Sequence, residues 1–418
     1  MDKSKYTRRI IETNIKDILT YMGGVVITGP RDCGKSWTAE MIGGNIHKMD
    51  ADENEVNKFY INSELFFSQQ KPMVIDEWQV VENMWNKVRD EINKSTEFGQ
   101  FILTGSAAPA PDSKKHTGAG RIASIQMYTM SYSEENTSSK EVEFDHLIDG
   151  TKVYGASKFG LDEHIEHIIK GGWPRLCALD YLKAGMAVEK YVDSIVNADF
   201  KKISGKSNSK TTEKIMNAIS RNLLTHASIE KIAEEAYINT KTLSRYTKLL
   251  SDINVLEYVD AWKPHIRSSI RINMKPKWNW TDPSIAVASL QLSKDKLLND
   301  LQYTGFLFES LVGRDLKIYS QSIGAKIYYY QDKEKLEVDY IIELKNGDII
   351  AIEVKLGGEK LIKDGIESLK AFKRKIETSK IVNVHKICSL NIFVSNGLSY
   401  TTNDGINIIN FGHFYKEY

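Results

Sequence analysis

The stretch that decides the fold is Val25-Val26-Ile27-Thr28-Gly29-Pro30-Arg31-Asp32-Cys33-Gly34-Lys35-Ser36. β-Branched apolar residues lead into a Gly-x4-Gly-Lys-Ser loop, which is the order of a phosphate-binding loop between a buried strand and a helix. The glycines let backbone N–H groups approach phosphate oxygens, and the following helix favours an anion at its N-terminus. A chance glycine-rich turn would not require strand, loop and helix in this order.

This loop predicts a nucleotide site, for which we expect ATP and Mg²⁺ as cofactors and ADP as the second bound nucleotide. Lys35 offers a positive charge to the β- and γ-phosphates, and Ser36 offers a hydroxyl to Mg²⁺. The residues expected to contact the nucleotide belong to the loop and the start of its helix; they are Gly29, Pro30, Arg31, Asp32, Cys33, Gly34, Lys35, Ser36 and Trp37.

Two further apolar strands end in polar residues. Residues 71–75 lead into the adjacent carboxylates Asp76 and Glu77, the arrangement that follows a phosphate-binding loop in nucleotide hydrolases. We expect Asp76 to hold Mg²⁺ and Glu77 to polarise the water that attacks the γ-phosphate. The strand at 101–104 ends in a polar segment, where Thr104 or Ser106 either senses the γ-phosphate or caps a turn.

Composition limits the function classes. A chain of 418 residues is long enough for two or three domains. Its formal net charge of +1 means that any nucleic-acid contact requires a local basic patch. The three cysteines are widely separated, which predicts a reduced, cytoplasmic protein without a zinc site. The polar N-terminus and the absence of a long apolar stretch predict no contact with a membrane.

The middle of the chain resembles a winged helix-turn-helix. Two short helical patterns flank a turn at 237–239, and an apolar strand pattern follows at 254–259. On the outward face of the second helix we expect Lys241, Arg245 and Lys248, where a DNA reader places its contacts. Residues 201–282 carry 15 Lys and Arg against 8 Asp and Glu, which fits phosphate contact. A packing module with a solvated basic face would give the same pattern.

A predicted β-hairpin at 337–355 carries Asp339 and then Glu353-x-Lys355, the PD-(D/E)xK nuclease pattern. Glu353 and Lys355 are two residues apart and therefore share a face, which Asp339 can reach across the hairpin. The two carboxylates would bind Mg²⁺, the lysine would orient or deprotonate the attacking water, and Glu309 could supply a third carboxylate. A surface hairpin of alternating charge would look the same, and such domains can bind nucleic acid without cleaving it.

Taken together, the motifs resemble one AAA-type family of prokaryotic ATPases with a conserved C-terminal domain of unknown function. The resemblance implies that Arg121, after Gly120, neutralises transition-state charge, either within its own subunit or in a neighbour, so oligomers are conceivable. From spacing alone, Arg121 would be a solvated side chain. The resemblance rests on the phosphate-binding loop, Asp76-Glu77, Leu103-Thr104-Gly105-Ser106, Gly120-Arg121, residues 128–134 and residues 171–174. Met130 departs from the family, which usually has proline there.

We therefore expect an α/β protein of three domains. Residues 1–160 would form an AAA-type P-loop ATPase with a parallel sheet, residues 161–285 a helical lid with a winged helix, and residues 286–418 a restriction-endonuclease-like domain. The nucleotide state would gate action of the last domain on DNA or RNA. The alternatives are an ATP-dependent binding switch whose last domain only docks a partner, and a winged-helix regulator that binds DNA.

Overall fold

The computed structural model describes residues 6–105, 120–199, 209–262, 275–378 and 386–418. The chain forms two compact units. The first comprises residues 1–129, with the segment 250–255 and residue 418, and the second comprises residues 130–249 and 256–417. This division does not follow the boundaries expected at 160 and 285, and the three-domain organisation stays a prediction.

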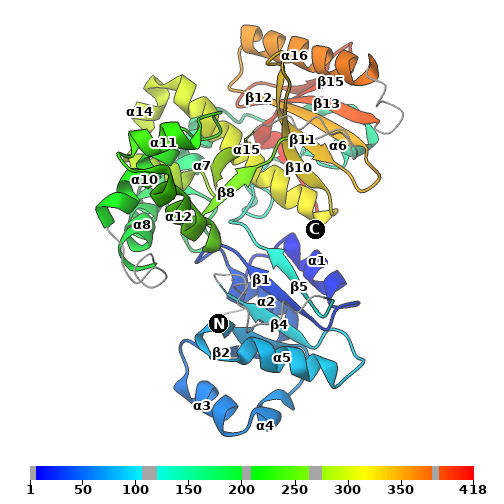
Figure 1. Cartoon of the computed structure of the whole chain (residues 1–418). Helices are drawn as coiled ribbons and strands as arrows, with labels where there is room; N and C mark the ends of the chain where they lie inside the picture. The colour runs from blue at the N-terminus through cyan, green and yellow to red at the C-terminus, as the bar shows by residue number, and fades with distance from the viewer. Residues whose placement is uncertain (1–5, 106–119, 200–208, 263–274, 379–385) are drawn as a thin grey trace. The chain divides into compact units, whose positions relative to one another are not determined.

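A parallel sheet forms the centre of the first unit (Figure 1). Within the described residues its strands run in the order β2-β3-β4-β1-β5, and every neighbouring pair is parallel. The carboxyl ends of β1, β3 and β4 therefore meet at one edge, which is where ligands bind in open parallel sheets. The strands are β1 (Gly24–Thr28), β2 (Ile46–Lys48), β3 (Met73–Asp76), β4 (Phe101–Thr104) and β5 (Ile122–Gln126).

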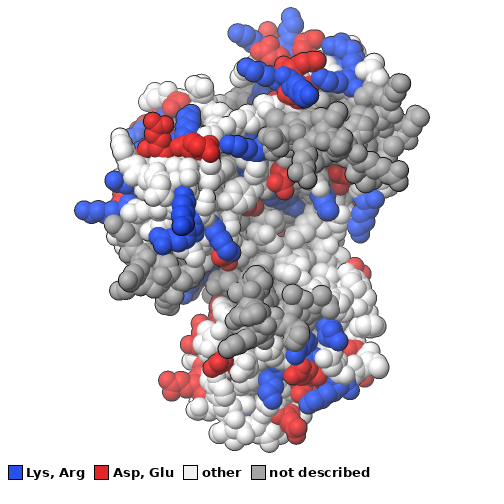
Figure 2. Space-filling model, in the orientation of Figure 1, with Lys and Arg blue, Asp and Glu red and all other residues white. Residues whose placement is uncertain are grey.

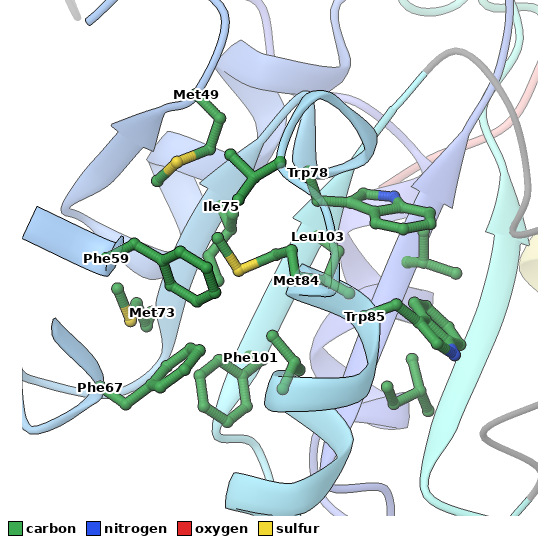
Figure 3. Packing of buried hydrophobic residues seen from close by; sticks show 14 of the residues in the cluster. Met49, Phe59, Phe67, Met73, Ile75, Trp78, Met84, Trp85, Phe101 and Leu103 are labelled. Atoms are coloured by element: carbon green, nitrogen blue, oxygen red, sulfur yellow. The ribbon is translucent and has the colours of Figure 1, made fainter. Parts of the chain in front are cut away.

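Helices bury both faces of this sheet, which explains why its strands are continuous apolar runs. Val25 packs on one face, with α1 (Ile11–Ile18) and α2 (Lys35–Gly43), while Val26 packs on the other, with α5 (Met84–Asn93). The second face also contacts α3 (Glu53–Ile61) and α4 (Ser63–Phe67). Figure 3 shows this core, whose labelled side chains include Phe59, Met73, Ile75, Trp78, Met84, Trp85 and Phe101.

A mixed sheet organises much of the second unit. Its described strands run in the order β10-β11-β12-β13-β15-β14-β7, with parallel pairing only for β12-β13 and β13-β15. Strand β7 comes from the region expected to belong to the ATPase domain. The strands are β7 (Tyr154–Gly155), β10 (Lys326–Gln331), β11 (Glu337–Glu343), β12 (Ile349–Lys355), β13 (Ile387–Val394), β14 (Ser399–Thr401) and β15 (Ile406–Asn410). A separate parallel pair joins β6 (Val142–Glu143) to β16 (Phe414–Tyr415).

Two long helices lie against this sheet (Figure 1). α16 (Glu359–Thr378) packs Leu369 and Phe372 against it, whereas α15 (Leu301–Ser322) is buried along most of its length. α15 approaches β11 closely at Gly313, where a Cβ atom would lie 2.2 Å from the hydroxyl of Tyr340. The same hydroxyl donates to the carbonyl of Glu309 at 2.9 Å, so this contact fixes Glu309 beside the sheet.

Helices fill the rest of the second unit. After α10 (Ser209–Arg221), the described residues form a helix, a turn, a second helix and a two-stranded antiparallel sheet. This is the order of elements expected from the sequence. The fold class expected from the sequence is confirmed as α/β, with a parallel P-loop core followed by helical and sheet-rich regions. The remaining elements are α6 (His146–Asp149), α7 (Leu161–Lys170), α8 (Tyr181–Ser194), α10 (Ser209–Arg221), α11 (Ile229–Glu235), α12 (Thr240–Asp252), β8 (Leu256–Val259), β9 (Lys277–Trp280), α13 (Ser284–Leu290) and α14 (Lys294–Asn299).

None of the helices in the described part of the chain combines the length and the apolar character needed to span a bilayer.

Candidate functional site

The phosphate-binding loop joins β1 to α2 through backbone conformations that favour glycine. Gly29 and Gly34 have φ angles of 152° and 106°. A Cβ atom on Gly29 would lie 2.2 Å from the carbonyl oxygen of Met127, so no larger residue fits there without a shift of the backbone. Asp32 also adopts a positive φ angle, of 62°. These conformations give the loop its tight curve between β1 and α2.

Lys35 lies inside this loop. Its side chain is buried, and its Nζ donates to the carbonyls of Gly29 at 3.0 Å and Pro30 at 2.8 Å. These contacts place a positive charge at the centre of the loop, where phosphate oxygens can replace the two carbonyls. Of the other loop residues, Cys33 is buried, Arg31 and Asp32 are exposed, and Trp37 is half-buried with its ring centroid 6.2 Å from that of Tyr6.

Three oxygen-bearing side chains meet at the carboxyl edge of the sheet. The hydroxyl of Ser36 donates to Oδ1 of Asp76 at 2.7 Å, and the hydroxyl of Thr104 donates to the same oxygen. This donor set fits a Mg²⁺ ion, which prefers carboxylate, hydroxyl and phosphate oxygens. Thr104 is thus placed at the predicted site, although its contact is with Asp76. Ser106, the other candidate at the end of this strand, lies outside the described residues.

Glu77 follows Asp76 in a left-handed conformation, with a φ angle of 50°. Its carboxylate accepts a hydrogen bond from the amide of Gln79. Burial raises the pKa of Glu77, while the nearby charge of Lys35 opposes this shift. A half-buried carboxylate near the loop lysine is suited to orienting a water molecule next to bound phosphate.

The structure adds a residue that we did not single out from the sequence. Arg9 is 3% exposed, and its guanidinium donates to the carbonyl of Cys33 at 2.8 Å within the phosphate-binding loop. It also donates to the carbonyls of Tyr128 at 2.9 Å and Thr129 at 3.2 Å. Arg9 therefore joins the loop to the segment that follows β5. The only indication of Arg9 in the sequence is its position, as a charged residue directly before the apolar residues of the first helix.

The structure places Arg121 at the end of the sheet opposite the phosphate-binding loop. Arg121 directly precedes β5, and its carbonyl accepts from the backbone N–H of Gly24 at 3.1 Å. Gly24 begins β1, whereas the phosphate-binding loop leaves the opposite end of that strand. The Arg121 side chain is exposed and donates to Asn93. The role of Arg121 at a nucleotide, in its own subunit or in a neighbour, stays a prediction.

The hairpin of β11 and β12 brings Asp339, Glu353 and Lys355 together. Lys355 Nζ lies 2.6 Å from Glu353 Oε2 and 3.5 Å from Asp339 Oδ2. Asp339 also accepts from the backbone N–H of Val354 at 2.7 Å, and Glu353 accepts from the hydroxyl of Ser368 at 2.7 Å. Burial of Lys355 disfavours its charged form, but the carboxylates of Asp339 and Glu353 outweigh this effect and raise the pKa of Lys355. Burial raises the pKa of Glu353 to about 8, and the charge of Asp339 adds to this shift.

Glu309 reaches the same area from α15. Burial raises its pKa to about 8, and its Oε1 has no hydrogen-bond partner among the described residues. The Nζ of Lys277, on β9, lies 3.8 Å from this oxygen and 2.5 Å from Oε1 of Glu337. We call Glu309, Glu337, Asp339 and Glu353 the carboxylate cluster. Lys277 and Glu337 were not among the predicted site residues, because nothing in their local sequence indicates that they meet.

Several members of the carboxylate cluster line a cavity of about 450 Å³. Its walls include apolar residues of α15 and of the turn after α10, together with Lys277 and Lys355. In the described part of the chain, no group of three His, Cys, Asp or Glu side chains is arranged to hold a metal ion. Of the expected set of Glu309, Asp339 and Glu353, the first two line this cavity, and metal binding by the set stays a prediction.

The predicted nucleic-acid residues lie on one helix. Lys241, Arg245 and Lys248 of α12 are all exposed. Figure 2 shows basic side chains on this part of the second unit. The antiparallel pair β8-β9 ends at Val259 and Lys277, and beyond β8 an isolated bridge joins Ala261 to Tyr329 of β10. Trp262 packs in the same apolar core as the C-terminal sheet, so the chain that leaves β8 contacts this sheet, and residues 263–274 lie outside the described residues.

The loop, the carboxylate pair and the parallel sheet of the first unit define a P-loop nucleotide-hydrolysing domain. Residues 23–136 match the family described as AAA domain, which supports ATP binding and hydrolysis by an AAA-type ATPase domain. Residues 161–296 and 304–411 match two families described as domains of unknown function, DUF8612 and DUF4143.

Comparison with curated proteins gives no match. Among solved structures, the chain is similar to the Walker-type ATPase PABY2304 of Pyrococcus abyssi, with 11% sequence identity and a TM-score of 0.43. That similarity covers 68% of this chain and 96% of the other.

Proposed function

We propose that the first unit binds and hydrolyses ATP, and that its nucleotide state controls a nuclease-like site in the second unit. The contact of Ser36 and Asp76 beside the buried Lys35 carries the first part of this proposal. Lys35 neutralises phosphate charge, Ser36 and Asp76 hold Mg²⁺, and Glu77 orients the attacking water. When bound, Mg²⁺ would draw negative charge from the phosphate oxygens.

The second part of the proposal is that Asp339, Glu353 and Lys355 act on nucleic acid. All three face one another, and Asp339 and Lys355 open onto the cavity. Lys355 lies between the two carboxylates, where it can orient a water molecule next to a phosphodiester. The Oε1 of Glu309, buried beside them and without a hydrogen-bond partner among the described residues, is the observation that favours an additional cation here. A divalent cation would supply Lewis acidity and a more acidic bound water.

The basic face of α12 is the proposed nucleic-acid contact. Lys241, Arg245 and Lys248 are exposed on a helix that follows a short helix and a turn, as in a helix-turn-helix reader. Their contacts would be with phosphates and would add affinity for DNA or RNA without fixing a sequence preference. We place the protein in the cytoplasm, in keeping with three cysteines that form no disulfide.

The alternative function is an ATP-dependent binding switch whose last domain docks nucleic acid or protein without cleaving it. The lack of a preformed set of three metal ligands in the described residues favours this alternative. A regulator that binds duplex DNA through α12 is a third candidate, favoured by the exposed basic face alone.

The test is cleavage of plasmid DNA, single-stranded DNA and RNA with Mg²⁺ or Mn²⁺, each with and without ATP. Loss of cutting in Asp339→Ala would assign cleavage to the second unit, and the Lys35→Ala variant would show whether ATP controls it. If no substrate is cut while ATP hydrolysis is intact, the binding switch replaces the nuclease.

A further inference from the structure

The carboxylate cluster contains a cationic side chain from outside its own sheet. Lys277 lies on β9, which pairs with β8 in the middle region of the chain. Its Nζ contacts Glu337 at 2.5 Å and Glu309 at 3.8 Å, and its side chain is 4% exposed. Lys277 therefore occupies a position next to the carboxylates that a bound cation would also favour.

β9 is fixed over α15 by a second contact on the same face. Side chains two residues apart on a strand point the same way, so Asn279 lies on the Lys277 side of β9. The hydroxyl of Ser310 donates to Oδ1 of Asn279 at 2.7 Å, next to Glu309 on α15. The position of Lys277 thus depends on how β9 lies on this helix, and any shift of β9 would move the ammonium group.

The carboxylate cluster has more carboxyl groups than cationic side chains to pair with them. Four carboxyl groups lie near the two ammonium groups of Lys277 and Lys355. His226 also faces Glu337, at 3.1 Å. The Oε1 of Glu309 accepts no hydrogen bond from the described residues and lies 3.8 Å from the Nζ of Lys277, so this oxygen suits a cation at closer range.

Lys277 is poorly placed to contact a phosphodiester. Its side chain is 4% exposed and its ammonium group already faces two carboxylates, which would repel an anionic substrate that entered the cavity. Although burial disfavours its charge, Glu309 and Glu337 raise its pKa, so it stays cationic. Its geometry is that of an internal counter-ion.

We propose that Lys277 competes with a divalent metal cation for Glu309 and Glu337, so that the cation binds strongly only when β9 withdraws its lysine. This proposal rests on the proposed cation site at Asp339. It adds the residue, Lys277, through which the middle region of the chain would control the affinity of that site for a metal cation. Lys277 is thus a positioning residue that acts through Glu309 and Glu337.

The test is calorimetric titration of the full chain with Mn²⁺, which needs no nuclease activity, with every variant made in an Asp76→Ala background that removes the proposed metal ligand of the ATP site. Lys277→Met should bind Mn²⁺ about tenfold more tightly than the wild type, since two carboxylates lose their competing charge. The matched control is Lys275→Met, because Lys275 lies just before the same strand but is exposed and pairs only at the surface, with Glu230 at 3.5 Å. The control should bind Mn²⁺ like the wild type.

Two further variants, Lys277→Arg and Asp339→Ala, test the counter-ion proposal and the cation site separately. If Lys277→Met does not fold, Lys277→Arg retains the charge and adds hydrogen bonds to the carboxylates, and it should weaken Mn²⁺ binding relative to the wild type. Asp339→Ala should lose the binding event in either background. Equal or weaker Mn²⁺ binding by Lys277→Met would overturn the counter-ion proposal and leave the cation site intact. Binding that is absent from every variant, or that survives Asp339→Ala, would instead overturn the proposed cation site.

Discussion

Replacement of Arg9 by methionine should loosen the phosphate-binding loop. The substitution keeps an apolar stem but removes three hydrogen bonds, at 2.8, 2.9 and 3.2 Å, to buried backbone carbonyls. A hydrogen bond involving a charged group contributes about 1.5–3 kcal/mol, and bonds from one guanidinium are not independent. We therefore expect the free energy of unfolding of the first unit to fall by about 3 kcal/mol.

The assay is urea denaturation of the full chain, in which the transition shifted by ATP reports the first unit. ATP affinity should also fall by about tenfold, or 1.4 kcal/mol, because Arg9 holds the carbonyl of Cys33 in the loop. Arg8→Met is the matched control, since Arg8 is exposed and adjacent in sequence. If Arg9→Met and Arg8→Met unfold within 1 kcal/mol of each other by this measure (about the error of such a comparison), the reasoning is refuted.

Two other predictions concern the second unit. Burial raises the pKa of Glu135 to about 8, from an ordinary value of 4.5, so the folded state binds its proton more tightly than the unfolded state. The resulting stabilisation is complete below pH 4.5 and is lost as the pH rises to about 8. The melting temperature of Glu135→Gln should therefore depend less on pH over this range than that of the wild type. An unchanged pH dependence would contradict this assignment. On α12, Lys241→Ala and Arg245→Ala should each weaken DNA binding and reduce the slope of log affinity against log salt by about 1, and unchanged slopes would exclude phosphate contact by these residues.

Local patterns could indicate the residues of the nucleotide site because most of them follow directly after strand ends, with Arg9 as the exception. The strands before Gly29, Asp76 and Thr104 are buried on both faces, so they are visible as apolar runs, and their parallel order brings their carboxyl ends together. The hairpin with Asp339, Glu353 and Lys355 was predicted for a similar reason, because alternation along paired strands fixes which side chains share a face.

The remaining features depend on contacts between distant segments. Lys277 meets Glu337 across 60 residues of chain, and Arg9 meets Tyr128 across 119 residues, so neither pairing has a local signature. The position of Arg121 could not be predicted, because its spacing after the P-loop does not say at which end of the sheet it lies. β7, which joins the C-terminal sheet from residues 154–155, is another pairing that local periodicity does not reveal.

The central claim is that the first unit hydrolyses ATP through the loop lysine and the carboxylate after β3. The most direct measurement combines ATP binding with ATP turnover for the wild type, Lys35→Ala and Glu77→Gln. We predict that Lys35→Ala loses ATP binding, whereas Glu77→Gln binds ATP but turns it over at least about a hundredfold more slowly, as expected when a general base is removed. Turnover by Glu77→Gln at the rate of the wild type, or undiminished ATP binding by Lys35→Ala, would contradict the account.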